Sequence, residues 1–135
     1  RQTGFTGTGA EPNLDAVSQV IDDQLAPVLV RADGGTGLSW RPGSNRVLVV
    51  FSDEAPQSYT SSCYGSCPAL MTDTANRLTL GGIKLHVFTR MDYDSWSPWL
   101  QLSTAGRGRN WDITAAPLDL ERFLDDLLRE VTCQP

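Results

Sequence analysis

The chain has 135 residues, 40% of them hydrophobic and 20% charged, which is typical of one globular domain and argues against a disordered or fibrous chain. Its net charge of −5 argues against nucleic-acid binding, because affinity for the phosphate backbone comes mainly from clustered Lys and Arg. No apolar run approaches the roughly 18 to 20 residues needed to cross a bilayer, so we expect no direct membrane insertion.

The N-terminal segment up to Pro12 is rich in Gly and Thr and is predicted to be a loop. It begins with Arg1 and has none of the features of a signal peptide, so we expect the chain to be processed or excised from a longer protein. From Asn13, apolar residues recur at helical spacing, which predicts an amphipathic helix that ends before Pro27. Residues 28–45 carry turn signals and are predicted to be a connection.

The sequence RVLVVFS at residues 46–52 predicts the main strand. Its five consecutive apolar residues suit a strand that is covered on both faces, in a parallel sheet between helices. In open α/β sheets, the ligand site lies beyond the carboxyl ends of the strands. Ser52, Asp53 and Glu54 come at that end, so we expect them to lie where such a fold holds a ligand or a cation.

Cys63 and Cys67 lie in the polar loop after this strand, with three residues between them. This spacing differs from the two-residue spacing of redox and zinc-binding motifs, and no second His or Cys pair completes a zinc site. We therefore predict a disulfide bond between these two residues, with three reduced cysteines in a cytosolic protein as the alternative. Cys133 is then expected to be free or paired with a cysteine upstream of Arg1.

A second helix and a second strand follow the cysteines. Pro68 is predicted to open a helix that runs to about Leu80 and is stopped by two glycines. Residues 83–89, IKLHVFT, predict a strand whose alternation suggests less complete cover than the first strand has. His86 is the only histidine, and its position in the middle of this strand favours a structural role over a general base.

The remaining elements are a short aromatic segment, a strand and a helix. Residues 92–108 hold Trp96 and Trp99 and are predicted to form a short helix or turn that packs aromatic rings against the sheet edge, with ligand contact as the alternative. A last short strand is expected at residues 110–113. Residues 117–131 predict the clearest helix in the chain, with one apolar stripe and one charged, solvated side.

Strands that alternate with helices of this length indicate right-handed βαβ units in a doubly wound α/β sheet. Two or three strands are too few for such a sheet, so we expect strands to be missing at the N-terminal end. The strand at residues 46–52 should then find its second neighbour in another chain or in upstream residues.

Three segments together resemble the von Willebrand factor type A family: EPNLDAV at 11–17, LSWRPGS at 38–44 and RVLVVFSD at 46–53. They are most similar to the integrin β-subunit variety and its bacterial relatives. The later GGIKLHVFT strand and LERFLDDLL helix are similar to the last strands and C-terminal helix of that family. The resemblance implies a Rossmann-like three-layer α/β/α sandwich with a mainly parallel sheet, forming one domain over residues 1–135 that lacks its N-terminal strands.

The resemblance also implies a metal-ion-dependent adhesion site at the edge of the sheet. In the family, this site takes an Asp-x-Ser-x-Ser motif from the first strand and further ligands from two other loops. Asp53 matches the third-loop Asp, Glu11 matches the second-loop position, and Thr8 is a nearby hydroxyl. The Asp-x-Ser-x-Ser motif does not occur in this sequence, so we expect weak binding of Mg²⁺ or Mn²⁺. Ser52 and Glu54 are the candidate ligand-binding residues beside the metal.

Structural roles are the alternative for these residues, with Asp53 as a loop or helix cap and Glu11 as a partner of a helix dipole. The resemblance implies an extracellular, cell-surface or periplasmic adhesion module that binds an acidic side chain of a protein ligand. The alternative is a metal-independent structural module whose sheet is completed by a missing N-terminal segment or another chain. The alternative from another class is an α/β enzyme, but we expect no enzyme, since no phosphate loop, nucleophile elbow or Cys/His pairing supports one.

Overall fold

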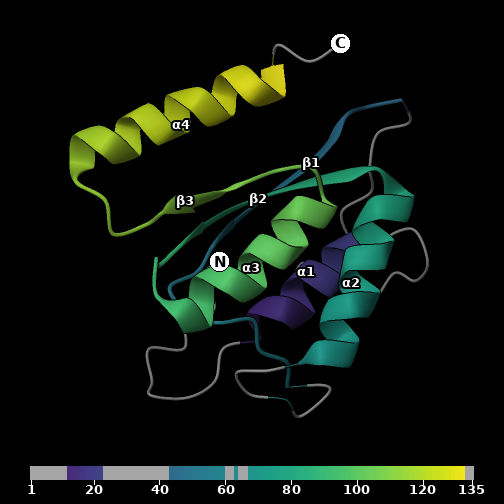
Figure 1. Ribbon diagram of the computed structural model, residues 1–135. Helices are drawn as coiled ribbons and strands as arrows, with labels where there is room; N and C mark the ends of the chain where they lie inside the picture. The colour runs from purple at the N-terminus through teal and green to yellow at the C-terminus, as the bar shows by residue number, and fades with distance from the viewer. Residues whose placement is uncertain (1–11, 23–42, 60–62, 64–66, 133–135) are drawn as a thin grey trace, which may run out of the picture.

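The computed structural model describes residues 12–22, 43–59, 63 and 67–132. These residues form four helices and three strands (Figure 1): α1 (Asn13–Asp22), β1 (Arg46–Phe51), α2 (Pro68–Gly81), β2 (Ile83–Thr89), α3 (Tyr93–Ala105), β3 (Asn110–Asp112) and α4 (Pro117–Thr132). The strands form one parallel sheet in the order β1-β2-β3. The predicted α/β class with a parallel, Rossmann-like sheet is confirmed.

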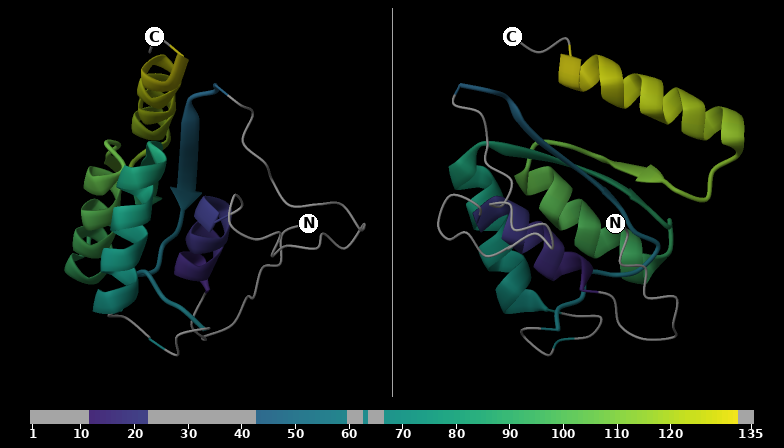
Figure 2. Two further views of the ribbon diagram at one scale, coloured as in Figure 1. Left: turned by 90° about the vertical axis from the view of Figure 1, so that its right-hand side faces the viewer. Right: turned by 180° about the vertical axis from the view of Figure 1, so that it is seen from behind.

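The sheet separates two layers of helices. In Figure 1, α4 lies on one side of the sheet and the other three helices lie on the opposite side, and the right-hand view of Figure 2 shows the same separation. Alternate strand residues face the two layers, as expected for extended backbone. Leu85 and Val87 of β2 join the core under α1, α2 and α3, whereas Phe88 packs with Trp111 and Leu127 on the α4 side.

The centre of the sheet is β2, and the expectation that β1 is the more completely covered strand was wrong. All β2 residues except Lys84 are buried, whereas residues 46–50 of β1 are half-buried and Phe51 is 60% exposed. In the described part of the chain, β2 pairs along both edges and β1 pairs along one. A continuous apolar run shows that a strand tolerates burial, but the neighbours that it gains in space decide whether it is buried.

Local signals explain where α2 and α3 begin and end. Pro68 starts α2, and Gly82 ends it in the left-handed conformation at φ 60°, which glycine adopts without strain. Asp92 caps α3, because its side chain accepts a hydrogen bond of 2.8 Å from the Ser95 amide. α3 is a 13-residue helix, longer than the short helix or turn expected, and it accommodates Pro98 in its interior.

The other predicted boundaries agree within a residue where they can be compared. Ser52 lies beyond β1, yet its amide still donates to the Phe88 carbonyl at 3.0 Å. Ile113 follows β3 in the same way and donates to the Thr89 carbonyl at 2.9 Å. α1 is described as far as Asp22, so its predicted end lies outside the described residues.

Candidate functional site

The loop that follows β1 places two carboxylates at the carboxyl edge of the sheet. Asp53 and Glu54 are both exposed there, whereas the preceding Ser52 is buried. This is the edge at which open α/β sheets bind ligands, as the sequence predicted for these three residues. Glu11 and Thr8, the other candidate metal ligands, lie outside the described residues.

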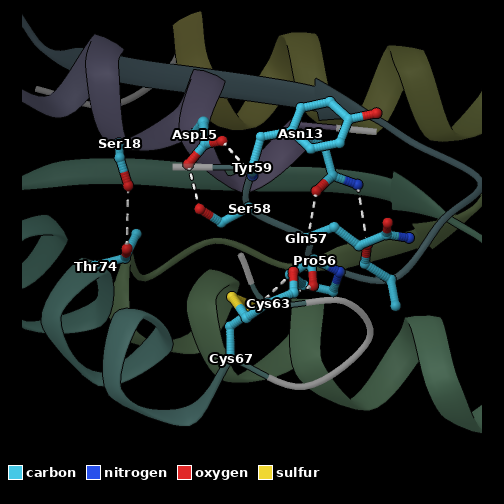
Figure 3. The surroundings of a disulfide bond; sticks show 11 residues. Asn13, Asp15, Ser18, Pro56, Gln57, Ser58, Tyr59, Cys63, Cys67 and Thr74 are labelled. Atoms are coloured by element: carbon cyan, nitrogen blue, oxygen red, sulfur yellow. Dashed lines mark hydrogen bonds between the residues drawn. A yellow bond between two sulfur atoms is a disulfide. The ribbon is translucent and has the colours of Figure 1, made fainter. Parts of the chain in front are cut away.

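Asn13, the first residue of α1, holds this loop through three hydrogen bonds, and Figure 3 shows Asn13 beside Gln57. Its Nδ2 donates to the Ser52 hydroxyl and to the Ala55 carbonyl, both at 3.0 Å, and its Oδ1 accepts from the Gln57 amide at 2.8 Å. The sequence placed Asn13 only at the start of the predicted helix. Its place in the EPN motif was the available signal, but the loop partners could not be read from that motif.

The Ser52 hydroxyl is occupied by contacts within the protein. Besides accepting from Asn13, it donates to the Glu54 carbonyl at 3.2 Å and accepts from the Glu54 amide at 3.3 Å. These contacts shape the turn that presents Asp53 and Glu54. A direct ligand contact by Ser52 stays a prediction, and its observed contacts are structural.

Asp15, one turn further along α1, fixes the end of the same loop. Its carboxylate accepts from the Ser58 hydroxyl at 2.5 Å and from the Tyr59 amide at 2.7 Å. Ser58 also forms an antiparallel bridge with Cys63, with both backbone hydrogen bonds at 3.1 Å. α1 therefore holds both ends of the segment between β1 and the first cysteine.

The predicted disulfide between Cys63 and Cys67 is confirmed, with their Cα atoms 5.5 Å apart (Figure 3). Cys67 is buried directly before α2, so the bond links the loop to the start of that helix. A disulfide of this kind is consistent with an oxidising compartment. Cys133 lies outside the described residues.

Trp99 holds the backbone of the same loop through a hydrogen bond. It is fully buried in α3, and its indole nitrogen donates to the Glu54 carbonyl at 2.8 Å. The tryptophan therefore packs in the core, as expected, and also fixes the backbone of a candidate site residue. Buried Trp side chains commonly find such a partner for their single N–H group.

The described residues at this edge offer few metal ligands. Asp53 and Glu54 supply two carboxylates, and the Glu54 side chain accepts a hydrogen bond of 3.3 Å from the Gln57 side chain. No group of three His, Cys, Asp or Glu residues within the described segments is arranged to hold a metal ion. Mg²⁺ takes near-octahedral oxygen coordination, so this pair would need water and further donors to retain it.

His86 lies on the α4 side of β2, in the middle of the strand. It is fully buried, neither ring nitrogen has a hydrogen-bond partner in the described part of the chain, and its ring centre is 5.3 Å from that of Trp111. Burial lowers the pKa of His86 below its ordinary value, and the Glu130 carboxylate partly opposes this shift. Its position in the strand interior agrees with the structural role favoured from sequence.

Comparison with known proteins found no matching family model, no similar curated protein and no similar solved structure. The resemblance to the von Willebrand factor type A family therefore rests on the sequence motifs and stays a prediction. Among the described residues, no helix has the length and apolar character needed to span a membrane.

Proposed function

We propose that the chain is a protein-binding module that uses the carboxyl edge of its sheet. The observation that carries this proposal is the display of Asp53 and Glu54 as exposed carboxylates on a loop whose backbone is held by Asn13 and Trp99. A loop that is already ordered loses less conformational entropy when a partner binds. The order of this loop therefore supports a role in binding a partner, rather than contact with solvent alone.

A divalent cation is the proposed link between this edge and the partner. Carboxylates are hard oxygen ligands of the kind that Mg²⁺ and Mn²⁺ accept, and such ions commonly keep water in their remaining positions. In this proposal, Asp53 is a direct ligand, Glu11 and Thr8 add donors, and Glu54 and Ser52 lie beside the ion. An acidic side chain of the partner would replace a bound water. The resemblance to the type A family supports this assignment.

The proposed compartment is extracellular, on the cell surface or in the periplasm. The disulfide between Cys63 and Cys67 supports an oxidising location, because cytosolic thiols are mostly kept reduced. The adhesion role implied by the resemblance also belongs outside the cytosol.

Isothermal titration calorimetry with Mg²⁺ and Mn²⁺ tests the cation. We expect the chain to bind with a dissociation constant in the millimolar range, since carboxylate-poor sites are weak. Asp53→Asn keeps the side-chain shape and removes the charge, and should weaken binding about tenfold. Asp125→Asn, which alters an exposed carboxylate on α4, is the matched control and should leave the affinity unchanged. Equal affinities for the chain and for Asp53→Asn would eliminate Asp53 as a ligand.

A second candidate is a metal-independent structural module in which another strand pairs with β1. Within the described residues, β1 has one neighbouring strand, and the exposed Phe51 continues a row of stacked rings. The Phe51 and Phe88 ring centres are 4.6 Å apart, and those of Phe88 and Trp111 are 5.0 Å apart. A missing N-terminal segment or another chain is the proposed source of the additional strand. An unpaired strand edge favours pairing, because its backbone N–H and C=O groups serve as a template for another strand.

A further inference from the structure

A groove of about 400 Å³ opens between α2 and α3, next to the disulfide. Its walls come from the loop after β1, the start of α2 and residues 93–101 of α3. The lining residues include Pro56, Cys67, Met71, Tyr93, Asp94 and Gln101. This volume suits one or two side chains of a ligand.

The groove has an apolar floor and a polar rim. Pro56, Cys67 and Met71 are buried side chains that form its floor. Tyr93 is 85% exposed at the rim, where Gln101 is also exposed. An apolar floor with a few polar groups around it is the usual composition of a binding pocket.

The described lining of the groove carries a negative charge. Among the described lining residues, Asp94 is the one carboxylate and none is a Lys or Arg. In the described part of the chain, the Asp94 side chain has no ion-pair or hydrogen-bond partner. The neighbouring cation, Arg90, is already paired with Asp92 at 3.4 Å.

A second acceptor lies on the same residue. Pro98 has no N–H group, so it cannot supply the hydrogen bond that the Asp94 carbonyl would receive in an uninterrupted helix. The residue therefore offers a carboxylate and a backbone carbonyl that receives no hydrogen bond from residue 98. The occupant that complements them carries a positive charge and several N–H donors.

We propose that this groove binds an arginine side chain of a protein partner, with an adjacent apolar residue on the floor. A guanidinium group has five donors in a planar fork that matches a carboxylate, whereas an ammonium group acts as a point charge. It can also stack on the exposed ring of Tyr93. The apolar neighbour contacts Met71. The inference rests on the proposed role as a protein-binding module, but it does not require the cation.

A nuclear magnetic resonance titration with the peptide acetyl-Leu-Arg-amide tests the groove. Amide resonances of Tyr93, Asp94 and Gln101 should shift, with a dissociation constant in the millimolar range because the peptide is small. The same peptide with citrulline in place of arginine keeps the shape and loses the charge, and it should bind about fivefold more weakly. Asp94→Asn should weaken binding of the arginine peptide by a similar factor, and Asp125→Asn on α4 serves as the matched control.

Three results would overturn the inference: equal binding of the two peptides, equal loss in Asp94→Asn and Asp125→Asn, or no shift at the groove residues at about 10 mM peptide. Repeating the titration in excess EDTA separates this site from the cation site. If peptide binding is unchanged in EDTA and calorimetry shows no Mg²⁺ binding, the proposed cation site is rejected and the proposed arginine site in the groove is retained. Loss of peptide binding in EDTA would show that the peptide needs the cation, and would overturn the proposal that the groove binds arginine without it.

Discussion

At the scale of single residues, Asn13 connects the start of α1 to the loop that carries the candidate site. Asn13→Ala removes three hydrogen bonds and leaves the buried Gln57 amide without its acceptor. We expect the free energy of unfolding to fall by about 2 to 3 kcal/mol, because an unsatisfied buried group adds its desolvation cost to the lost bonds. Urea denaturation measures the change. Asn76→Ala, at an exposed site on α2, is the control, and equal stability of the two variants would contradict the role of Asn13.

His86 predicts a pH dependence of stability. Burial lowers the pKa of His86 in the folded protein, an effect that Lys84 and Arg109 reinforce and Glu130 on α4 opposes. Below the ordinary pKa of about 6.5, the unfolded chain therefore takes up a proton that the folded protein does not bind. Stability should decrease as the pH falls below about 6.5, down to the pKa of the folded state.

The measurement is urea unfolding at several pH values between about 7.5 and 5, within the range in which histidine titrates. His86→Leu removes the titrating ring and should flatten the curve, with little loss at neutral pH because the replaced nitrogens have no hydrogen-bond partner in the described structure. Asp92 does not interfere in this range. Hydrogen bonds from Ser95 lower the pKa of the Asp92 carboxyl, so its contribution is lost only in more acidic solution. An unchanged pH slope in His86→Leu would show that another group is responsible.

At the scale of elements, the connection from α3 to β3 passes so close to β2 that it requires glycine. A Cβ atom at Gly108 would lie 1.9 Å from the Leu85 carbonyl oxygen, far inside van der Waals contact. Gly108→Ala must therefore move backbone and should lower the free energy of unfolding by about 3 kcal/mol or more.

Gly81→Ala is the matched control for this substitution. Its Cβ would meet the flexible end of the Ile83 side chain at 3.2 Å, and alanine favours the helical conformation of the last residue of α2. We expect a change within about 1 kcal/mol. Thermal unfolding of both variants measures the contrast, and similar midpoints would contradict the close approach at Gly108.

α4 shows how a clear amphipathic pattern can be only partly covered. The sequence predicted one apolar stripe along this helix, but Leu127 is its one buried member, and Leu124 and Leu128 are 42% and 57% exposed. The apolar stripe of α4 is wider than the face of the three described strands against which it packs. A helical period indicates which face is apolar, but the neighbouring elements decide how much of it is covered.

At the scale of the whole molecule, the edge of β1 that has no neighbouring strand among the described residues predicts association through strand pairing. If another chain pairs with β1, sedimentation velocity should show concentration-dependent assembly that EDTA does not alter. Phe51→Lys places a charge at the exposed end of this strand and should reduce assembly, because edge charges oppose pairing. Leu80→Lys, at an exposed position on α2, is the control. A chain that is monomeric at all concentrations would reject pairing between copies.

The sequence by itself determined the features that depend on residues close together along the chain. Pro68 and Gly82 delimit α2, the spacing of Cys63 and Cys67 permits a local disulfide, and the period of residues 117–132 forms α4. The position of Asp53 and Glu54 directly after β1 was also predicted, since a strand and the loop that follows it are adjacent in sequence. Backbone geometry and short loop closure are local, so residue type and spacing are sufficient to indicate them.

Only the tertiary structure decided which strand is central and what holds the candidate site in place. β1 has the apolar run of a central strand, yet β2 occupies the centre because it pairs along both edges. Asn13 and Ser52 are 39 residues apart in the sequence and become hydrogen-bond partners only when α1 packs beside the end of β1. Asparagine offers donors and acceptors at any position, and folding selects their partners by bringing distant backbone within reach.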